Sequence, residues 1–184
     1  MKRARDSYCS YCGTQFAEPL LYPRTCRGCG AQIWANPLPV TVVLAQIIDG
    51  ERTGLLVVRR AIRPQIAKLA LVGGFLEAHE TWQQGGAREV REEAGVTIDP
   101  AQLEPHWFAS SEPTPDRVML FSLAPPLPAS ALPSFTPNGE ASERGIIYGP
   151  GGLDGVFAFS THVEAARRYF AARGVIAPHG FSAR

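Results

Sequence analysis

The amino-acid sequence predicts an α+β fold preceded by a small cysteine-rich module. Candidate strands and helices follow one another without the regular alternation of a parallel βαβ sheet. Of the 184 residues, 45% are hydrophobic and 19% are charged, which is enough apolar material for a packed core. The length suits one domain, or one domain with a small module, and all four cysteines lie close to the N-terminus.

The cysteines occur as two Cys-x-x-Cys pairs, Cys9 with Cys12 and Cys26 with Cys29. Two such pairs complete the closed tetrahedral sulfur site that Zn²⁺ prefers, in which no ligand position stays open for catalysis. Disulfides and an iron–sulfur site are the alternatives, but no apolar export signal is visible in the first thirty residues. We therefore predict a structural zinc ribbon over residues 1–36, in which the metal replaces a hydrophobic core.

Three strands are expected in the next part of the chain. Asn36 to Pro39 forms a stiff connector, and Asp49-Gly50 marks a turn. β-Branched and apolar residues fill the segments between these breaks, and a pair of glycines, Gly73 and Gly74, ends the third segment. The predicted strands are 40–48, 55–60 and 68–72.

A helix is predicted over residues 81–94. Thr81 is the expected N-cap, Gln84 stands at the third helical position of a capping box, and a glycine follows the last helical residue. Gly85 and Gly86 lie inside this helix and each costs about 1 kcal/mol relative to alanine. Close packing of the helix on a sheet is expected to offset that cost.

The second half of the sequence contains three more strand candidates and a final helix. The segment 125–137 contains five prolines and is expected to be a loop. The last helix should start near Ser160 and Thr161, with Glu164 completing a capping box on Thr161, and end at Gly174. Its predicted buried face consists of Val163, Ala166 and Phe170. The strands are expected at 106–110, 117–124 and 146–148.

Three acidic residues of the first predicted helix share one face. Glu89, Glu92 and Glu93 stand at positions i, i+3 and i+4, where like charges repel, and Arg88 partly neutralises Glu92. A surface helix normally mixes charges of both signs along such a face. Carboxylate oxygens suit Mg²⁺ or Mn²⁺, which take substrate phosphates as further ligands. The cluster therefore predicts a site for divalent cations.

The segment 74–96 resembles the Nudix box at every defining position. Gly74 and Glu80 are followed, after seven residues, by the block 88–96, which reads Arg-Glu-Val-Arg-Glu-Glu-Ala-Gly-Val. The resemblance implies a Nudix fold, a mixed β-sheet between helices, over residues 37–174, with a C-terminal tail at 175–184. It also implies hydrolysis of a nucleoside diphosphate linked to another moiety, with Mg²⁺ or Mn²⁺ as cofactor.

The same resemblance assigns roles to individual residues. It implies that Glu89, Glu92 and Glu93 are magnesium ligands, together with the backbone carbonyl of Gly74. Arg88 would orient these carboxylates, and Glu80 would brace the loop and helix. Family members often use a further acid beyond the box as a ligand or general base. We favour Glu140 for that role, with Glu143 as the other candidate of the same segment and Glu112 as the fallback.

A ribbon followed by a Nudix domain resembles pyrophosphatases that act on FAD, ADP-ribose or NAD(H). A Ser-Gln-Pro-Trp-Pro-Phe-Pro signature marks the NADH pyrophosphatases. Residues 110–117 read Ser-Ser-Glu-Pro-Thr-Pro-Asp-Arg instead, so the sequence fits the group that includes FAD and ADP-ribose pyrophosphatases better. The alternative from another class is a catalytically idle nucleotide sensor whose ribbon contacts nucleic acid or protein. A housecleaning hydrolase of damaged nucleoside triphosphates is a third, narrower alternative.

The overall charge bears on possible partners. A formal net charge of +1 argues against holding nucleic acid by bulk electrostatics. Arg59, Arg60 and Arg63 flank the expected mouth of the site, and one of them is expected to bind phosphate. The most apolar run, 40–48, is too short to cross a membrane. We expect a cytoplasmic protein with a nucleotide-derived substrate, no membrane partner and a possible homodimer.

Overall fold

The computed structural model describes residues 6–17 and 21–184. The chain forms two compact units, Met1–Pro37 and Leu38–Arg184. In the first unit, β1 (Arg24–Thr25) pairs antiparallel with β2 (Gln32–Ile33). Each Cys-x-x-Cys turn of this unit is closed by a glycine, because Gly13 donates to the Cys9 carbonyl and Gly30 donates to the Cys26 carbonyl. Both glycines have φ above 70°, a conformation that other residues rarely adopt.

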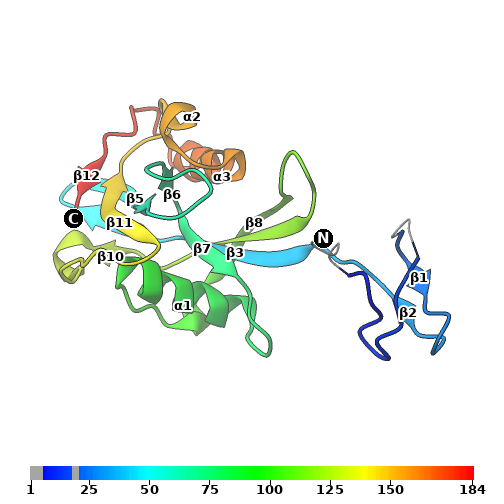
Figure 1. Ribbon diagram of the computed structural model, residues 1–184. Helices are drawn as coiled ribbons and strands as arrows, with labels where there is room; N and C mark the ends of the chain where they lie inside the picture. The colour runs from blue at the N-terminus through cyan, green and yellow to red at the C-terminus, as the bar shows by residue number, and fades with distance from the viewer. Residues whose placement is uncertain (1–5, 18–20) are drawn as a thin grey trace. The chain divides into compact units, whose positions relative to one another are not determined.

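The larger unit contains two β-sheets (Figure 1). In the four-stranded sheet the order is β7-β3-β9-β8, and β3 and β9 run parallel while the other pairs are antiparallel. Its strands are β3 (Leu38–Leu44), β7 (Val72–Phe75), β8 (Glu104–Ser110) and β9 (Arg117–Leu123).

The second sheet has six strands in the order β10-β4-β5-β11-β12, with β6 paired to β5. The predicted strand 40–48 is therefore two strands, because the chain leaves one sheet and enters the other at Ala45. The strands of this sheet are β4 (Gln46–Asp49), β5 (Arg52–Arg60), β6 (Leu69–Ala70), β10 (Leu127–Pro128), β11 (Ala141–Ile147) and β12 (Ser182–Ala183).

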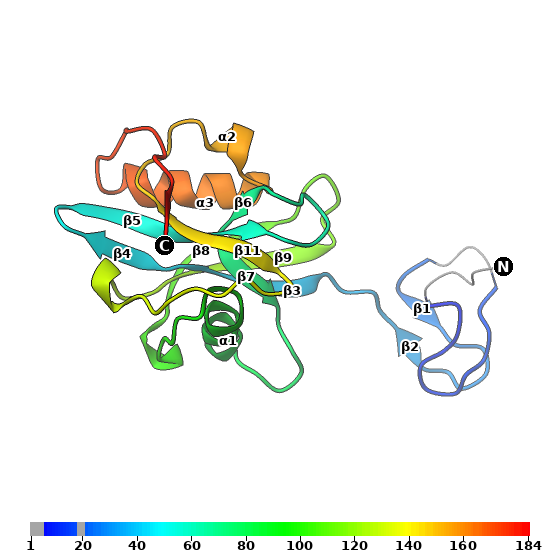
Figure 2. The ribbon, with the colours of Figure 1, turned by 60° about the vertical axis from the view of Figure 1, so that its left-hand side comes forward.

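Two long helices, α1 (Trp82–Ala94) and α3 (Ser160–Ala171), cover opposite sides of the sheets (Figure 2). A shorter helix, α2 (Leu153–Val156), precedes α3, and two 3₁₀ turns lie at Pro100–Gln102 and Ala129–Ala131. One buried apolar cluster lies on the α3 side and a second on the α1 side. Among the described residues, no helix is long and apolar enough to cross a bilayer. The α+β prediction is confirmed.

The predicted start and end of α1 are confirmed. The Thr81 hydroxyl accepts from the Gln84 amide N–H at 3.2 Å, and the Gln84 side chain accepts from the Thr81 N–H at 2.8 Å. The helix ends at Gly95 in the left-handed conformation. A Cβ on Gly86 would lie only 3.0 Å from Cγ2 of Val43, so the helix packs more closely on β3 than an alanine would comfortably allow. This close packing offsets the poor helix propensity of the glycine.

Several sequence expectations need correction. Gly73 and Gly74 do not end a strand but lie within β7. The expected capping box on Thr161 is absent, because the N-cap of α3 lies two residues earlier, at Phe159, and no side chain caps the helix. The ring of Phe159 packs instead on His162, with the ring centroids 5.0 Å apart. The predicted burial of Val163, Ala166 and Phe170 is confirmed.

The C-terminal half contains more β-structure than expected. The proline-rich segment includes β10, which pairs parallel with β4 at an edge of the sheet, where a missing proline N–H is tolerated. The strand expected at 146–148 begins already at Ala141 and pairs along β5. Residues 175–184, expected to be a tail, include β12, which pairs antiparallel with β11 through Gly145 and Ala183. These pairings join residues far apart in the sequence.

Alanine at Gly73 should destabilise the larger unit. A Cβ there would lie 2.3 Å from the Thr41 carbonyl oxygen and 2.7 Å from Cα of Val42, both backbone atoms of β3. The strands must separate, so the Gly73→Ala variant should lose about 1–3 kcal/mol of unfolding free energy in urea. Gly155→Ala is the matched control, since nothing lies within 4 Å of its added Cβ. Equal stability of the two variants would contradict this packing.

Candidate active site

The site is built on two carboxylates buried between α1 and β7. Glu89 and Glu93 are only 8% and 6% exposed although both are acidic. The Gly73 N–H donates to Oε2 of Glu93 at 3.3 Å. A Cβ on Gly74 would lie 2.3 Å from Oε1 of Glu89, so glycine leaves the room that this carboxylate occupies. Gly74 therefore leaves room for the Glu89 carboxylate, and the Gly73 N–H binds Glu93, so both carboxylates lie against the backbone of β7.

A third carboxylate joins them from the loop before β11. Glu89, Glu93 and Glu140 each offer one oxygen, and these oxygens lie within 4.8 Å of one another. Glu140 is exposed, so the cluster is open to solvent on that side. The donors are hard oxygens, which fit Mg²⁺ or Mn²⁺, and such ions usually keep several ligand positions for water and phosphate. These three residues form what we call the carboxylate cluster.

Burial controls the electrostatics of the carboxylate cluster. It raises the pKa of Glu89, although contact with Arg88 opposes the shift. It raises the pKa of Glu93 to about 8, and the charges of Glu89 and Glu140 add to the effect. A divalent cation among these oxygens would favour the ionised forms and reverse both shifts. The surrounding residues therefore do not supply enough positive charge to keep these carboxyl groups ionised, and a bound cation would supply it.

Arg88 connects α1, the preceding loop and β7. Its guanidinium donates to both carboxylate oxygens of Glu80, at 3.2 and 2.8 Å. It also donates to Oε1 of Glu89 at 2.7 Å and to the Phe75 carbonyl at 3.0 Å. Glu80 in turn accepts from the Glu77 N–H at 2.7 Å. Arg88 thereby fixes the direction of the Glu89 carboxylate through charge-assisted hydrogen bonds.

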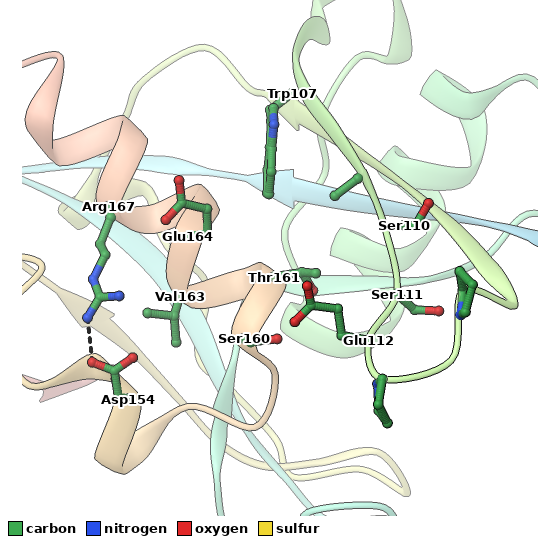
Figure 3. Close-up of a pocket in the computed structure, with 13 residues that line it drawn as sticks. Trp107, Ser110, Ser111, Glu112, Asp154, Ser160, Thr161, Val163, Glu164 and Arg167 are labelled. Carbon is green, nitrogen blue, oxygen red and sulfur yellow. Dashed lines mark hydrogen bonds and ion pairs between the residues drawn. The ribbon is translucent and has the colours of Figure 1, made fainter.

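A cavity of about 670 Å³ lies between the β8–β9 loop and the start of α3 (Figure 3). Glu112 stands on the loop wall, and Glu164 stands on the helix wall. Arg167 on the helix wall pairs with Asp154 of α2. This cavity could not be predicted from the sequence, because its walls come from segments about fifty residues apart that share no motif. Its lining includes Trp107, Ser111, Glu112, Asp154, Thr161, Glu164 and Arg167.

The four cysteines of the first unit converge on one point. Sγ of Cys9 lies 3.8 Å from Sγ of Cys29, and Sγ of Cys12 lies 3.6 Å from Sγ of Cys26. A tetrahedral ion with Zn–S bonds of about 2.3 Å separates its sulfur ligands by about 3.8 Å. A disulfide needs about 2.05 Å, and all four cysteines are unpaired. The arrangement fits the predicted zinc ribbon.

A NUDIX domain model matches residues 37–143. The chain belongs to the NUDIX family. It is 32% identical over 122 residues to a protein of Stutzerimonas stutzeri (strain A1501) described as NAD-capped RNA hydrolase NudC. That match covers 64% of this chain, and the chain spans about 40% of the length of this curated relative.

Solved structures share the fold. A NUDIX hydrolase from Nitrosomonas europaea superposes with a TM-score of 0.67 at 23% identity, covering 94% of this chain and 96% of that one. The NUDIX domain of Shewanella oneidensis NrtR, complexed with ADP ribose, gives a TM-score of 0.61 at 15% identity, covering 74% of this chain and 88% of that one. The expected Nudix fold is confirmed.

Three acids named from the sequence as candidate metal ligands or general bases lie outside the carboxylate cluster. The Glu92 side chain is 51% exposed and pairs with Arg88 at 3.3 Å and Arg91 at 3.4 Å. Glu143 pairs with Nε of Arg59 at 2.7 Å. Glu112 lines the cavity instead. The predicted role of Glu92 as a ligand would require its carboxylate to turn away from both arginines.

One of the three candidate phosphate-binding arginines lies near the carboxylate cluster. The Arg60 guanidinium stacks over the Phe159 ring at 5.0 Å from its centroid. Its positive charge lowers the otherwise raised pKa of Glu93. Arg59 is engaged by Glu143, so Arg60 is the better placed of these two to meet an anion at the cluster.

Elemental analysis tests the cysteine site. Native protein should carry about one zinc ion per chain, because four thiolates in this geometry fill all four positions of the ion. Replacement of Cys12 by serine should lower the zinc content, whereas replacement of the exposed Ser10 by alanine should not. Four reactive thiols and no bound metal in freshly purified protein would refute the zinc ribbon.

The buried Glu93 predicts how stability depends on pH. Its pKa rises from 4.5 in the unfolded chain to about 8 in the folded one, so the folded state keeps a proton that the unfolded state releases. Without added magnesium, the unfolding free energy should therefore fall as the pH rises from 4.5 to about 8.

Urea unfolding at several pH values measures this dependence. The Glu93→Gln variant should show a flatter profile, while Glu92→Gln, in which an exposed carboxylate is changed, should follow the wild type. Identical pH profiles for wild type and Glu93→Gln would show that the carboxyl of Glu93 is not buried as described.

Proposed function

We propose that this Nudix domain hydrolyses the pyrophosphate bond of a nucleoside diphosphate linked to another moiety, with Mg²⁺ or Mn²⁺. The observation that carries the proposal is the carboxylate cluster, in which three acidic side chains from α1 and a separate loop share one point beside β7. A pyrophosphate and three carboxylates repel one another. A cation between them is therefore needed before substrate can bind at this place.

Each residue of the site would have its own role in the reaction. A bound divalent cation would screen the phosphates and lower the pKa of a coordinated water. Glu89 and Glu93 would hold that cation, and the Gly74 backbone lies beside the Glu89 carboxylate to complete the site. Arg88 keeps Glu89 in place. Glu140 is the exposed member of the cluster, so we assign it contact with the attacking water as ligand or as proton acceptor.

The phosphates and the remaining part of the substrate would occupy different regions. Arg60, whose charge acts on Glu93, would contact a phosphate. It stacks on Phe159, and the next residue, Ser160, lines the cavity at the start of α3. The second moiety of the substrate would enter this cavity. FAD, ADP-ribose and NAD(H) all combine a pyrophosphate with such a moiety, and the similarity to a protein described as an NAD-capped RNA hydrolase supports testing them first.

Substitution of Glu93 should separate catalysis from folding. The Glu93→Gln variant keeps the size of the side chain but loses a charged ligand, so kcat should fall about 100-fold with Mg²⁺. Glu104→Gln on β8 changes an exposed acid outside the carboxylate cluster and should retain full activity. Product release from FAD, ADP-ribose, NADH and NADPH, followed chromatographically with purified protein, measures the effect.

The same panel, extended with nucleoside triphosphates, separates the proposed hydrolysis from the alternatives. Turnover of the triphosphates alone would favour the housecleaning hydrolase. If wild type and Glu93→Gln were equally inert on every compound, the proposed hydrolysis would be wrong. Nucleotide binding without turnover would then support the idle sensor.

A further inference from the structure

Asn138 joins the loop that carries Glu140 to the end of α1. Its side-chain amide group donates to the Glu92 carbonyl at 3.0 Å and to the Glu93 carbonyl at 3.4 Å. Its side-chain oxygen accepts from the backbone N–H groups of Glu140 and Ala141, both at 2.9 Å. One side chain therefore contacts the backbone of two members of the carboxylate cluster.

These four contacts use the whole hydrogen-bonding capacity of an asparagine side chain. The amide nitrogen has two donors and the oxygen has two acceptor sites. Carbonyl oxygens only accept and backbone N–H groups only donate, so the reverse orientation of the amide would leave four mismatched contacts. The surroundings thus fix which way the amide of Asn138 points.

The end of α1 and the loop at Glu140, which Asn138 joins, both take hydrogen bonds from other parts of the chain. The last carbonyls of an α-helix have no partner within the helix, and Asn138 satisfies those of Glu92 and Glu93 near the end of α1. The carbonyl of Glu140 accepts from the N–H of Ala61, which directly follows β5, at 2.7 Å. The backbone of Glu140 is therefore held on one side by Asn138 and on the other by the end of β5.

We infer that Asn138 is a positioning residue that holds Glu140 at the separation from Glu89 and Glu93 that a shared divalent cation requires. Three carboxylates at this separation repel one another, and Glu140 stands on a loop instead of a helix or strand. Without the connection, the loop would move away from α1 and the cluster would open. That the cation serves hydrolysis is taken from the proposed function, on which the inference rests in this respect.

A second connection between the same elements makes the inference testable in a folded protein. The buried Arg144 donates to the Ala94 carbonyl at 2.7 Å and to the Pro133 carbonyl at 2.6 Å. It keeps the end of α1 attached to the proline-rich segment when Asn138 is changed. Loss of Asn138 should therefore loosen Glu140 without unfolding the domain.

The test compares three variants of the full, zinc-loaded chain. Asn138→Ala removes all four contacts. Asn138→Asp keeps the acceptor for the Glu140 and Ala141 N–H groups but turns an oxygen toward the two helix carbonyls. Ser142→Ala is the matched control, because it removes another side-chain contact to backbone nearby, from Ser142 to the Arg59 carbonyl at 3.2 Å. The measurements are Mn²⁺ affinity by electron paramagnetic resonance, hydrogen exchange of the Glu140 and Ala141 amides, and kcat with KM.

Asn138→Ala should bind Mn²⁺ about 10-fold more weakly or worse, since loss of groups that support metal ligands costs 10–100-fold. The two amides should exchange faster, and kcat should fall more than KM rises. Asn138→Asp should keep slow amide exchange yet lose Mn²⁺ affinity, whereas Ser142→Ala should match the wild type in every measurement.

Wild-type Mn²⁺ affinity and amide exchange in Asn138→Ala would overturn the inference. A wild type that binds no Mn²⁺ would overturn it as well. Mn²⁺ binding that weakens in Asn138→Ala, together with no turnover of any nucleotide by the wild type, would uphold the inference and remove only the proposed hydrolysis.

Discussion

The candidate active site of the Nudix domain depends on the burial of two carboxylates against the backbone of one strand. Glu89 and Glu93 are buried away from water between α1 and β7, and this burial raises the pKa of each. Such an arrangement is unfavourable unless a compensating charge is present. Arg88 supplies part of it to Glu89, and a divalent cation would supply the rest. This need for positive charge is the physical basis of the proposed hydrolysis of a phosphate anhydride.

The surrounding structure maintains this unfavourable arrangement. Gly74 leaves room for the Glu89 carboxylate beside β7, Gly73 lets β7 approach β3, and Gly86 lets α1 approach β3. Asn138, from the segment that leads into β11, and Arg144, within β11, hold the C-terminal turn of the same helix. Each contact limits the movement of α1 relative to the sheets, so the cluster keeps its geometry without being stabilised by its own charges.

Local features could be predicted from the sequence because neighbouring residues determine them. The bounds of α1 follow from the capping box of Thr81 and Gln84 and from Gly95, and the spacing of the glutamates indicated one acidic face. The sequence could not show which acids are buried. Glu92 turns toward arginines at the surface, and the place of Glu140 depends on contacts of Asn138 with residues about 46 positions away. The β10 strand and the cavity beside α3 depend on similar long-range pairings.

Anomalous scattering from crystals grown with Mn²⁺ would locate the cation. A manganese peak is expected among the carboxylate oxygens of Glu89, Glu93 and Glu140, next to the backbone of Gly74. A peak held at the protein surface by Glu92 alone, with none between Glu89 and Glu93, would show that the carboxylate cluster does not bind the cation.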